Sequence, residues 1–196
     1  MEAVGIFVGL FFLLAPVVII ATVIYFVVRR RNGQEGITIS NALMTYFYAM
    51  TGASIVVTSV GMGFLLYALL VRAFDTGHPV ADDVTKGFAM LLTGLVFCVS
   101  HIFGRGALEK KEGKTANALR RVYLFFMLAI YSVAGLVSVP TAVYMTANYY
   151  VKESAHVHAP SGALATAIVV VPLWIYYLML ALKETRASKK EETAKS

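Results

Sequence analysis

Four histidines are the residues of this sequence with the most evident chemistry. His101 lies inside a long apolar stretch, whereas His78, His156 and His158 lie in short polar stretches beside acidic residues. A histidine in an apolar helix can be an axial ligand of haem b, or can contact a quinone or a lipid headgroup. In an extended segment His156 and His158 point to one side, and with His78 they could bind zinc or copper. His101 is therefore a candidate cofactor-binding residue, and the other three are candidate metal ligands.

Each of these interpretations has a structural alternative. Haem held by two histidines would need a second intramembrane histidine, which the sequence lacks, so haem would require Met90, Met179, a second copy of the chain or a partner subunit. In the structural alternative, His101 lies four residues before Arg105, near the membrane edge, and its imidazole reaches water or lipid headgroups there. The three loop histidines are equally compatible with ordinary surface positions, because nothing in the sequence shows that the two loops meet.

Trp174 is the second candidate cofactor-binding residue. It is the one tryptophan of the chain and is expected halfway along an apolar helix, deeper than the interface where tryptophan usually lies. Its indole N–H needs an acceptor, and Pro172 leaves the carbonyl of Ile168 without its helical donor. We expect Trp174 at a buried helix interface, with a quinone or lipid against its ring as the alternative.

The composition indicates that membrane helices position these residues. Of 196 residues, 59% are hydrophobic and 14% are charged, whereas about a quarter are charged in a typical soluble domain. The single cysteine, Cys98, excludes an internal disulfide and any Cys-x-x-Cys site. The net charge of +6 comes from basic residues at the ends of apolar runs, where membrane insertion places them. We therefore expect contact with lipid and no nucleic-acid partner.

The apolar runs predict an all-α integral membrane protein with five spanning helices, since a span needs about 20 residues. The predicted spans are 3–28, 41–72, 84–104, 120–150 and 162–182. They group into an N-terminal helix (1–31), a first hairpin (40–110), a second hairpin (117–186) and a charged cytoplasmic tail (187–196). A polar loop at 105–121, which carries six basic residues, joins the two hairpins.

The distribution of lysine and arginine predicts the orientation. Only Arg72, Lys86 and Lys152, of 17 basic residues, fall on the side opposite the rest. Because basic residues are enriched in cytoplasmic loops, the N-terminus is expected outside and the C-terminus in the cytoplasm of a multi-pass protein in the bacterial cytoplasmic (inner) membrane. No charged residue lies deep in a predicted span, which argues against an ion pump or a proton-coupled transporter.

Two further patterns bear on packing. Thr51, Ser54, Thr58 and Gly61 recur at helical spacing and predict a surface where another helix approaches closely. Tyr46 and Tyr48 near one membrane edge are typical of aromatic anchors.

The two predicted hairpins also align with each other. A shift of 77 residues places Tyr46 on Tyr123, and a shift of 76 places Cys98 on Trp174 and His101 on Tyr177. Since both hairpins are expected to begin on the same side, they would form a parallel repeat, related by an axis near the membrane normal.

The second hairpin carries Arg120, Arg121 and Tyr123 at the start of one helix, and Pro172, Trp174 and Tyr177 in the next. In this pattern it resembles a bacterial integral-membrane family of unknown function, in which an Arg-x-x-Tyr helix pairs with a Pro-x-Trp helix. The resemblance covers about residues 120–186, with a degenerate copy at 46–110. It departs from the family at Tyr177, where the family often has histidine. The resemblance implies a helical membrane fold and no particular chemistry.

These observations favour a non-catalytic accessory subunit or scaffold of a membrane complex, whose partners are other membrane subunits or further copies of the chain. The alternative is a redox-linked subunit that holds haem or quinone near His101 and Trp174. A small-solute transporter or channel has less support, namely the paired hairpins and helix breaks at Pro140 and Pro172.

Overall fold

The computed structural model describes residues 39–74, 77, 79–112, 114–151 and 159–193, and this part of the chain is helical with no strand. Its helices are α2 (Ile39–Ala73), α3 (Ala81–Glu112), α4 (Lys114–Val151) and α5 (Ser161–Thr193). All four are long and apolar enough to cross a membrane. The predicted span 3–28 lies outside the described residues, so four of the five expected spans are described.

The helices are longer than a bilayer requires. The 32 residues of α3 extend about 48 Å at 1.5 Å per residue, whereas the hydrocarbon core is about 30 Å thick. α4 is longer still, with 38 residues. Each helix therefore extends beyond the apolar layer at one end or both.

The predicted polar loop 105–121 is wrong, because almost all of it is helical. α3 continues to Glu112 and α4 begins at Lys114, so the predicted spans 84–104 and 120–150 were too short. The segment is rich in Ala, Leu, Glu and Lys, which favour helix. Arg105 and Glu109 also form an ion pair one helical turn apart. The charges that were expected to end the span therefore lie within a helix that continues through them.

Other boundaries differ less from the prediction. α3 begins at Ala81, three residues before the predicted start, with Asp82 and Asp83 in its first turn, where carboxylates favour the helix dipole. Between α2 and α3, Gly77 has a φ of 66°, a left-handed conformation that suits glycine. α5 continues to Thr193, so most of the predicted tail extends this helix.

Pro140 and Pro172 lie inside α4 and α5, which run on through both residues. Proline in a membrane helix is tolerated because neighbouring groups satisfy the freed backbone. The helices are therefore not interrupted at these two positions in the described structure.

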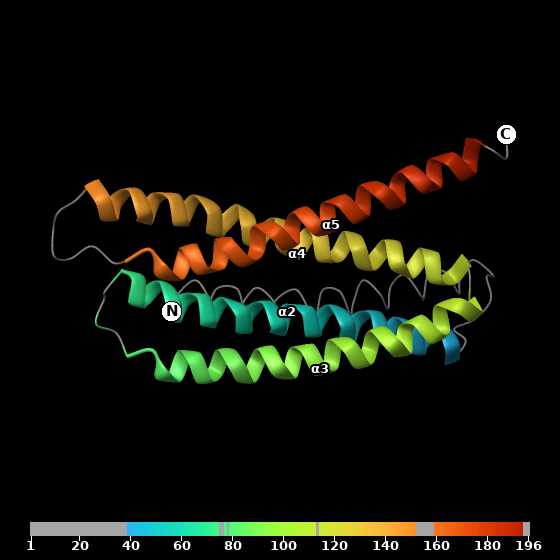
Figure 1. Ribbon diagram of the computed structural model, residues 1–196. Helices are drawn as coiled ribbons and strands as arrows, with labels where there is room; N and C mark the ends of the chain where they lie inside the picture. Colours follow the sequence, from blue (N-terminus) through green and yellow to red (C-terminus); the bar gives the residue numbers. More distant parts are fainter. Residues whose placement is uncertain (1–38, 75–76, 78, 113, 152–158, 194–196) are drawn as a thin grey trace.

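α2 occupies the middle of the described bundle (Figure 1). It packs most extensively with α3 and also contacts α4 and α5, whereas α3 touches α4 only slightly; α4 packs mainly with α5. The C-terminal ends of α2 and α4 lie at one end of the bundle, and the C-terminal end of α3 and the N-terminal end of α4 lie at the other (Figure 1). The charged end, defined as the end of the bundle that holds the α3–α4 junction, also receives the C-terminal end of α5.

The hairpin of α2 and α3 is held by close backbone contact. A Cβ added at Gly61 would lie 2.5 Å from the backbone nitrogen of Leu91, and one at Gly94 would lie 2.7 Å from that of Thr58. Both distances are too short for a side chain, so these positions accept only glycine without a shift of backbone. The close approach predicted from the small residues of α2 is confirmed.

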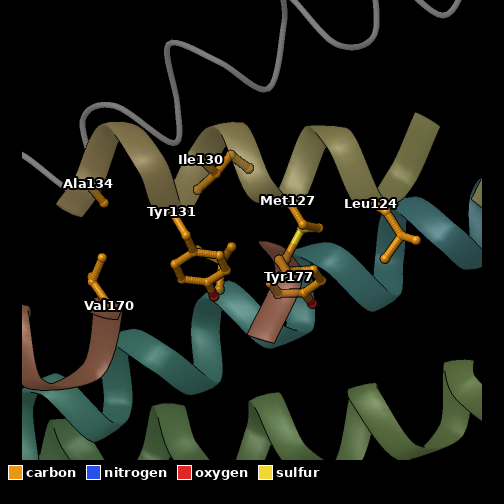
Figure 2. Packing of buried hydrophobic residues seen from close by; sticks show 8 residues of the cluster. Leu124, Met127, Ile130, Tyr131, Ala134, Val170 and Tyr177 are labelled. Carbon is orange, nitrogen blue, oxygen red and sulfur yellow. The ribbon is translucent and has the colours of Figure 1, made fainter. Parts of the chain in front are cut away.

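The apolar core lies where α4 and α5 meet α2 (Figure 2). Met127 and Tyr131 of α4 are fully buried, and Tyr177 of α5 and Val56 of α2 complete the centre of this cluster. Tyrosine in such a core brings a hydroxyl that needs a partner, which makes the core itself a candidate for chemistry.

Candidate functional site

A polar cluster joins three helices at the charged end of the bundle. The Tyr48 hydroxyl of α2 donates a hydrogen bond to the Glu109 carboxylate of α3. Arg105 Nε lies 3.3 Å from Glu109 Oε1, and the guanidinium carbon lies 4.9 Å from the centre of the Tyr48 ring and 5.9 Å from that of Tyr123 on α4. Cation–π attraction and the ion pair therefore fix Arg105 between two rings.

Tyrosines continue from this cluster into the core. The ring centroids of Tyr48 and Tyr123 are 5.3 Å apart, and the Tyr123 and Tyr177 hydroxyls are hydrogen bonded at 3.1 Å. The Tyr177 ring stacks on Tyr131 with centroids 5.6 Å apart, and the Tyr131 hydroxyl bonds to Ser59 at 2.8 Å. Figure 2 shows Tyr131 and Tyr177 facing each other beside Met127. This tyrosine ladder (Tyr48, Tyr123, Tyr177 and Tyr131) satisfies its hydroxyls by pairing helices.

The interpretation of Tyr48 as an aromatic anchor is wrong, because its side chain is buried. Arg105 and Glu109 lie four residues apart on α3, whereas Tyr48 lies 61 residues from Glu109, and only the register of α2 against α3 brings them together. Tyr46, the other expected anchor, is half exposed.

His101 is buried, with 8% of its surface exposed, so it does not reach water in the way its structural alternative required. Its Nδ1 lies 2.7 Å from the carbonyl of Phe97, and its Nε2 lies 3.4 Å from the Tyr46 hydroxyl. A carbonyl only accepts, so Nδ1 carries the proton and Nε2 accepts from Tyr46. The Phe97 ring stacks on the imidazole, and Phe47 and Tyr46 lie at its other sides.

This tautomer leaves Nε2 with the lone pair that a metal would bind, and hydrogen bonding of the other nitrogen to a carbonyl is the usual arrangement of a histidine ligand. Ligation would have to displace Tyr46. His101 is the only histidine in the part of the chain that the structure describes, so a second histidine ligand would come from elsewhere.

Trp174 lies against α4, but it is less buried than expected, because 36% of the residue's surface is exposed. Its N–H does find the acceptor that it needs: Nε1 donates to Ser132 Oγ of α4 at 3.0 Å. The acceptor is thus a hydroxyl of the neighbouring helix. His101 on α3 and Trp174 on α5 belong to different hairpins, and no direct contact joins them among the described residues.

An ionic contact closes the second hairpin at the charged end. Glu184 of α5 accepts a hydrogen bond from Arg120 Nη2, and Arg121 Nε lies 3.4 Å from its other carboxylate oxygen. Both arginines belong to α4. The Arg and Tyr positions singled out in the sequence therefore contact α5, although the glutamate that they meet was not predicted.

The candidate metal ligands His78, His156 and His158 lie outside the described residues. Within the residues described, no group of three or more His, Cys, Asp or Glu side chains is close enough to hold a metal ion.

Contacts that correspond under the shifts of 77 and 76 residues occur in both hairpins. Tyr46 contacts His101 in the first hairpin, and Tyr123 contacts Tyr177 in the second. Thr58 likewise meets Gly94 in the first hairpin, and at the corresponding positions of the second Gly135 meets Val170. The register of the two helices is thus the same in both hairpins.

Comparison with known proteins gives one family match. The profile of DUF5671, a domain of unknown function, matches residues 44–157. The match covers most of α2, all of α3 and all of α4. Arg120, Arg121 and Tyr123 therefore lie inside it, whereas Pro172 and Trp174 lie outside. The match agrees with the expected resemblance to a family of unknown function and includes residues 46–110 and 120–157, whereas residues 158–186 of the expected range lie outside it. Neither the curated proteins nor the solved structures give a match.

Proposed function

The chain belongs to the DUF5671 family, and on that premise we propose that it is a non-catalytic multi-pass membrane protein, an accessory subunit or scaffold of a membrane complex. The observation that supports this role is the use of its polar side chains. Many of the described groups that could carry chemistry contact a neighbouring helix; they are Arg105, Glu109, Tyr48, Tyr123, Tyr177, Tyr131, Ser59, His101, Tyr46, Trp174, Ser132, Arg120, Arg121 and Glu184.

Such pairing suits a scaffold more than an enzyme. A catalytic base or nucleophile must have an atom free to reach its substrate. The Glu109 carboxylate instead contacts both Arg105 and Tyr48, and the Tyr177 hydroxyl is bonded inside the core. Inside a membrane, hydrogen bonds between helices help to hold a bundle together. The geometry therefore favours a rigid helical bundle that other subunits bind.

Extraction of the native complex tests this role. The full chain, carrying an affinity tag, is taken from its own membrane in lipid nanodiscs formed by a polymer, and the mass of the particles is measured. We expect particles that contain a second protein or several copies of the chain. Particles that hold one copy and lipid only would contradict the role.

The orientation proposed from the sequence places the charged end of the bundle on the cytoplasmic side of the cell membrane. Arg105, Lys110, Arg120, Arg121 and Lys183 on α3, α4 and α5 support it, since basic residues favour the cytoplasmic side.

Thiol labelling in intact cells tests this orientation. The single natural cysteine is first removed as Cys98→Ser, and Glu112→Cys and Asp82→Cys then report on opposite ends of α3. An impermeant maleimide should label the variant at position 82 and leave that at position 112 unlabelled until the cells are opened. The reverse pattern would invert the topology.

The two hairpins are also proposed to be a parallel repeat. The shared register and the two pairs of corresponding contacts support this proposal. A duplicated hairpin explains why each unit presents an aromatic or histidine pair at the same depth.

The second candidate function is a redox-linked subunit that holds haem b or a quinone at His101. The tautomer of His101 supports it, because Nε2 keeps its lone pair while Nδ1 is held by the Phe97 carbonyl. The full chain, purified with its partners, should then show a Soret band that His101→Ala abolishes and Trp174→Phe leaves unchanged. A preparation with no such band, and no quinone in its organic extract, would remove this candidate.

A further inference from the structure

Two arginines share one carboxylate at the charged end of the bundle. Glu184 is the acidic partner of both Arg120 and Arg121. Two positive charges face one negative charge, so the group carries one net positive charge. The nearby carboxylate of Glu109 does not offset it, because that group is engaged by Arg105 and Tyr48.

The arginines remain open to the surroundings while the carboxylate does not. The side chains of Arg120 and Arg121 are 46% and 40% exposed, whereas that of Glu184 is 12% exposed. A guanidinium has five N–H donors, and each arginine directs one nitrogen at Glu184. Most of the donors of this pair are therefore available to a second acceptor.

The cluster of Arg120, Arg121 and Glu184 also borders exposed apolar side chains. Val122 and Phe125 follow the arginines on α4, Leu182 precedes Glu184 on α5, and all three are exposed. The exposed Lys183 adds a further positive charge beside them. A ligand that fits both surfaces has an anionic head and an apolar tail.

We propose that Arg120 and Arg121, whose two positive charges Glu184 only half neutralises, bind the phosphate of an anionic phospholipid whose acyl chain lies along Val122 and Phe125. The planar fork of arginine matches phosphate oxygens, and basic sites at the ends of membrane helices attract anionic lipid. The proposal goes beyond the scaffold role, because it names a ligand and its site. The lipid site can be tested independently of the scaffold role.

Native mass spectrometry of the full chain in mild detergent tests the site. Phosphatidylglycerol is the probe and phosphatidylcholine is the control lipid. We expect one tightly retained phosphatidylglycerol. Arg120→Gln should weaken its retention about fivefold, since a basic residue near such a headgroup contributes on the order of 1 kcal/mol. Lys86→Gln on α3, near the opposite end of the bundle, is the matched control and should leave retention unchanged.

Glu184→Gln separates the lipid site from a purely structural contact. This substitution keeps both arginines and removes the competing carboxylate, so lipid retention should rise. If the arginines only hold α4 against α5, Glu184→Gln and Arg120→Gln should lower stability alike and change retention in the same direction. Circular dichroism of each variant confirms that its helices are intact.

Three results would overturn the proposal. They are equal retention of phosphatidylglycerol and phosphatidylcholine, a fall in retention with Glu184→Gln, and displacement of the lipid by inorganic phosphate at equal concentration. The last would identify a site for free anions instead of lipid.

Discussion

The two hairpins share one register but are held by different interactions. In the α2–α3 hairpin, glycines bring the backbones into contact, as at Gly61 and Gly94. In the α4–α5 hairpin, a Cβ added at Gly135 would lie 3.6 Å from Val170, which is an ordinary contact. That hairpin depends instead on side chains, including the contact of Arg120 with Glu184 and that of Trp174 with Ser132. The same helical geometry can thus be stabilised by close backbone packing or by polar side-chain pairs. The two hairpins should therefore lose stability in response to different substitutions.

The largest effect is expected from Gly61→Ala in the first hairpin. The added Cβ would meet the backbone of Leu91 and Gly87, which cannot move aside as a flexible side chain can. We expect the free energy of unfolding to fall by about 3 kcal/mol. Unfolding in SDS, followed by circular dichroism, measures it.

Gly135→Ala in the second hairpin is the matched control for Gly61→Ala. Its Cβ has room beside Val170, so stability should be unchanged or slightly raised. Similar losses for both variants would show that the hairpins are packed alike.

The next largest effect is expected from removing the tyrosine hydroxyls that occupy corresponding positions in the two hairpins. Tyr123→Phe removes the 3.1 Å hydrogen bond to Tyr177 and should cost about 1 kcal/mol, because the Tyr177 hydroxyl is left inside the core. Tyr46→Phe removes the longer 3.4 Å contact to His101 from a half-exposed side chain and should cost less. The same SDS assay compares them. A greater loss of stability for Tyr46→Phe than for Tyr123→Phe would show that the hydroxyl contact of the first hairpin is the stronger of the two.

Glu184→Gln should lower the free energy of unfolding by less than about 1 kcal/mol, since both of its arginine partners are substantially exposed and screened. The loss should shrink further as salt is added. A loss that does not depend on salt would show that Glu184 acts through packing and not through charge.

The smallest effect is expected from Ser132→Ala, which removes the acceptor of the Trp174 N–H. Hydrogen bonds between membrane helices contribute about 0.6 kcal/mol on average, and this one lies at an exposed ring. Because Trp174 is the only tryptophan, its fluorescence reports the change directly and should shift to shorter wavelength. An unchanged spectrum would mean that the indole bonds elsewhere.

The sequence predicted the apolar spans well because lipid requires long runs of apolar residues and leaves few alternatives. It misplaced the helix ends, since the charges at Arg105 to Arg121 indicated a loop while the residues themselves favour helix. It also predicted that α2 packs closely on another helix, because small residues at helical spacing are visible in one segment.

Pairs between distant segments were harder to predict. Arg120, Arg121 and Tyr123 were singled out, but their contacts with Glu184 and Tyr177 depend on the register of α4 against α5. Tyr48 was misread for the same reason, since its partner Glu109 belongs to another helix. Trp174 shows that the need for an acceptor can be predicted while its identity cannot, because the acceptor, Ser132, lies on another helix 42 residues away in the sequence.

The extension of α3 and α4 beyond the apolar layer has a practical consequence. From Arg105 to Glu112, α3 adds eight helical residues, or about 12 Å, to the charged end of the bundle. The ends of α3 and α4 there would give an antibody fragment a helical epitope. A protein of 21.3 kDa, too small for single-particle imaging by itself, could in that way be aligned and its partners seen.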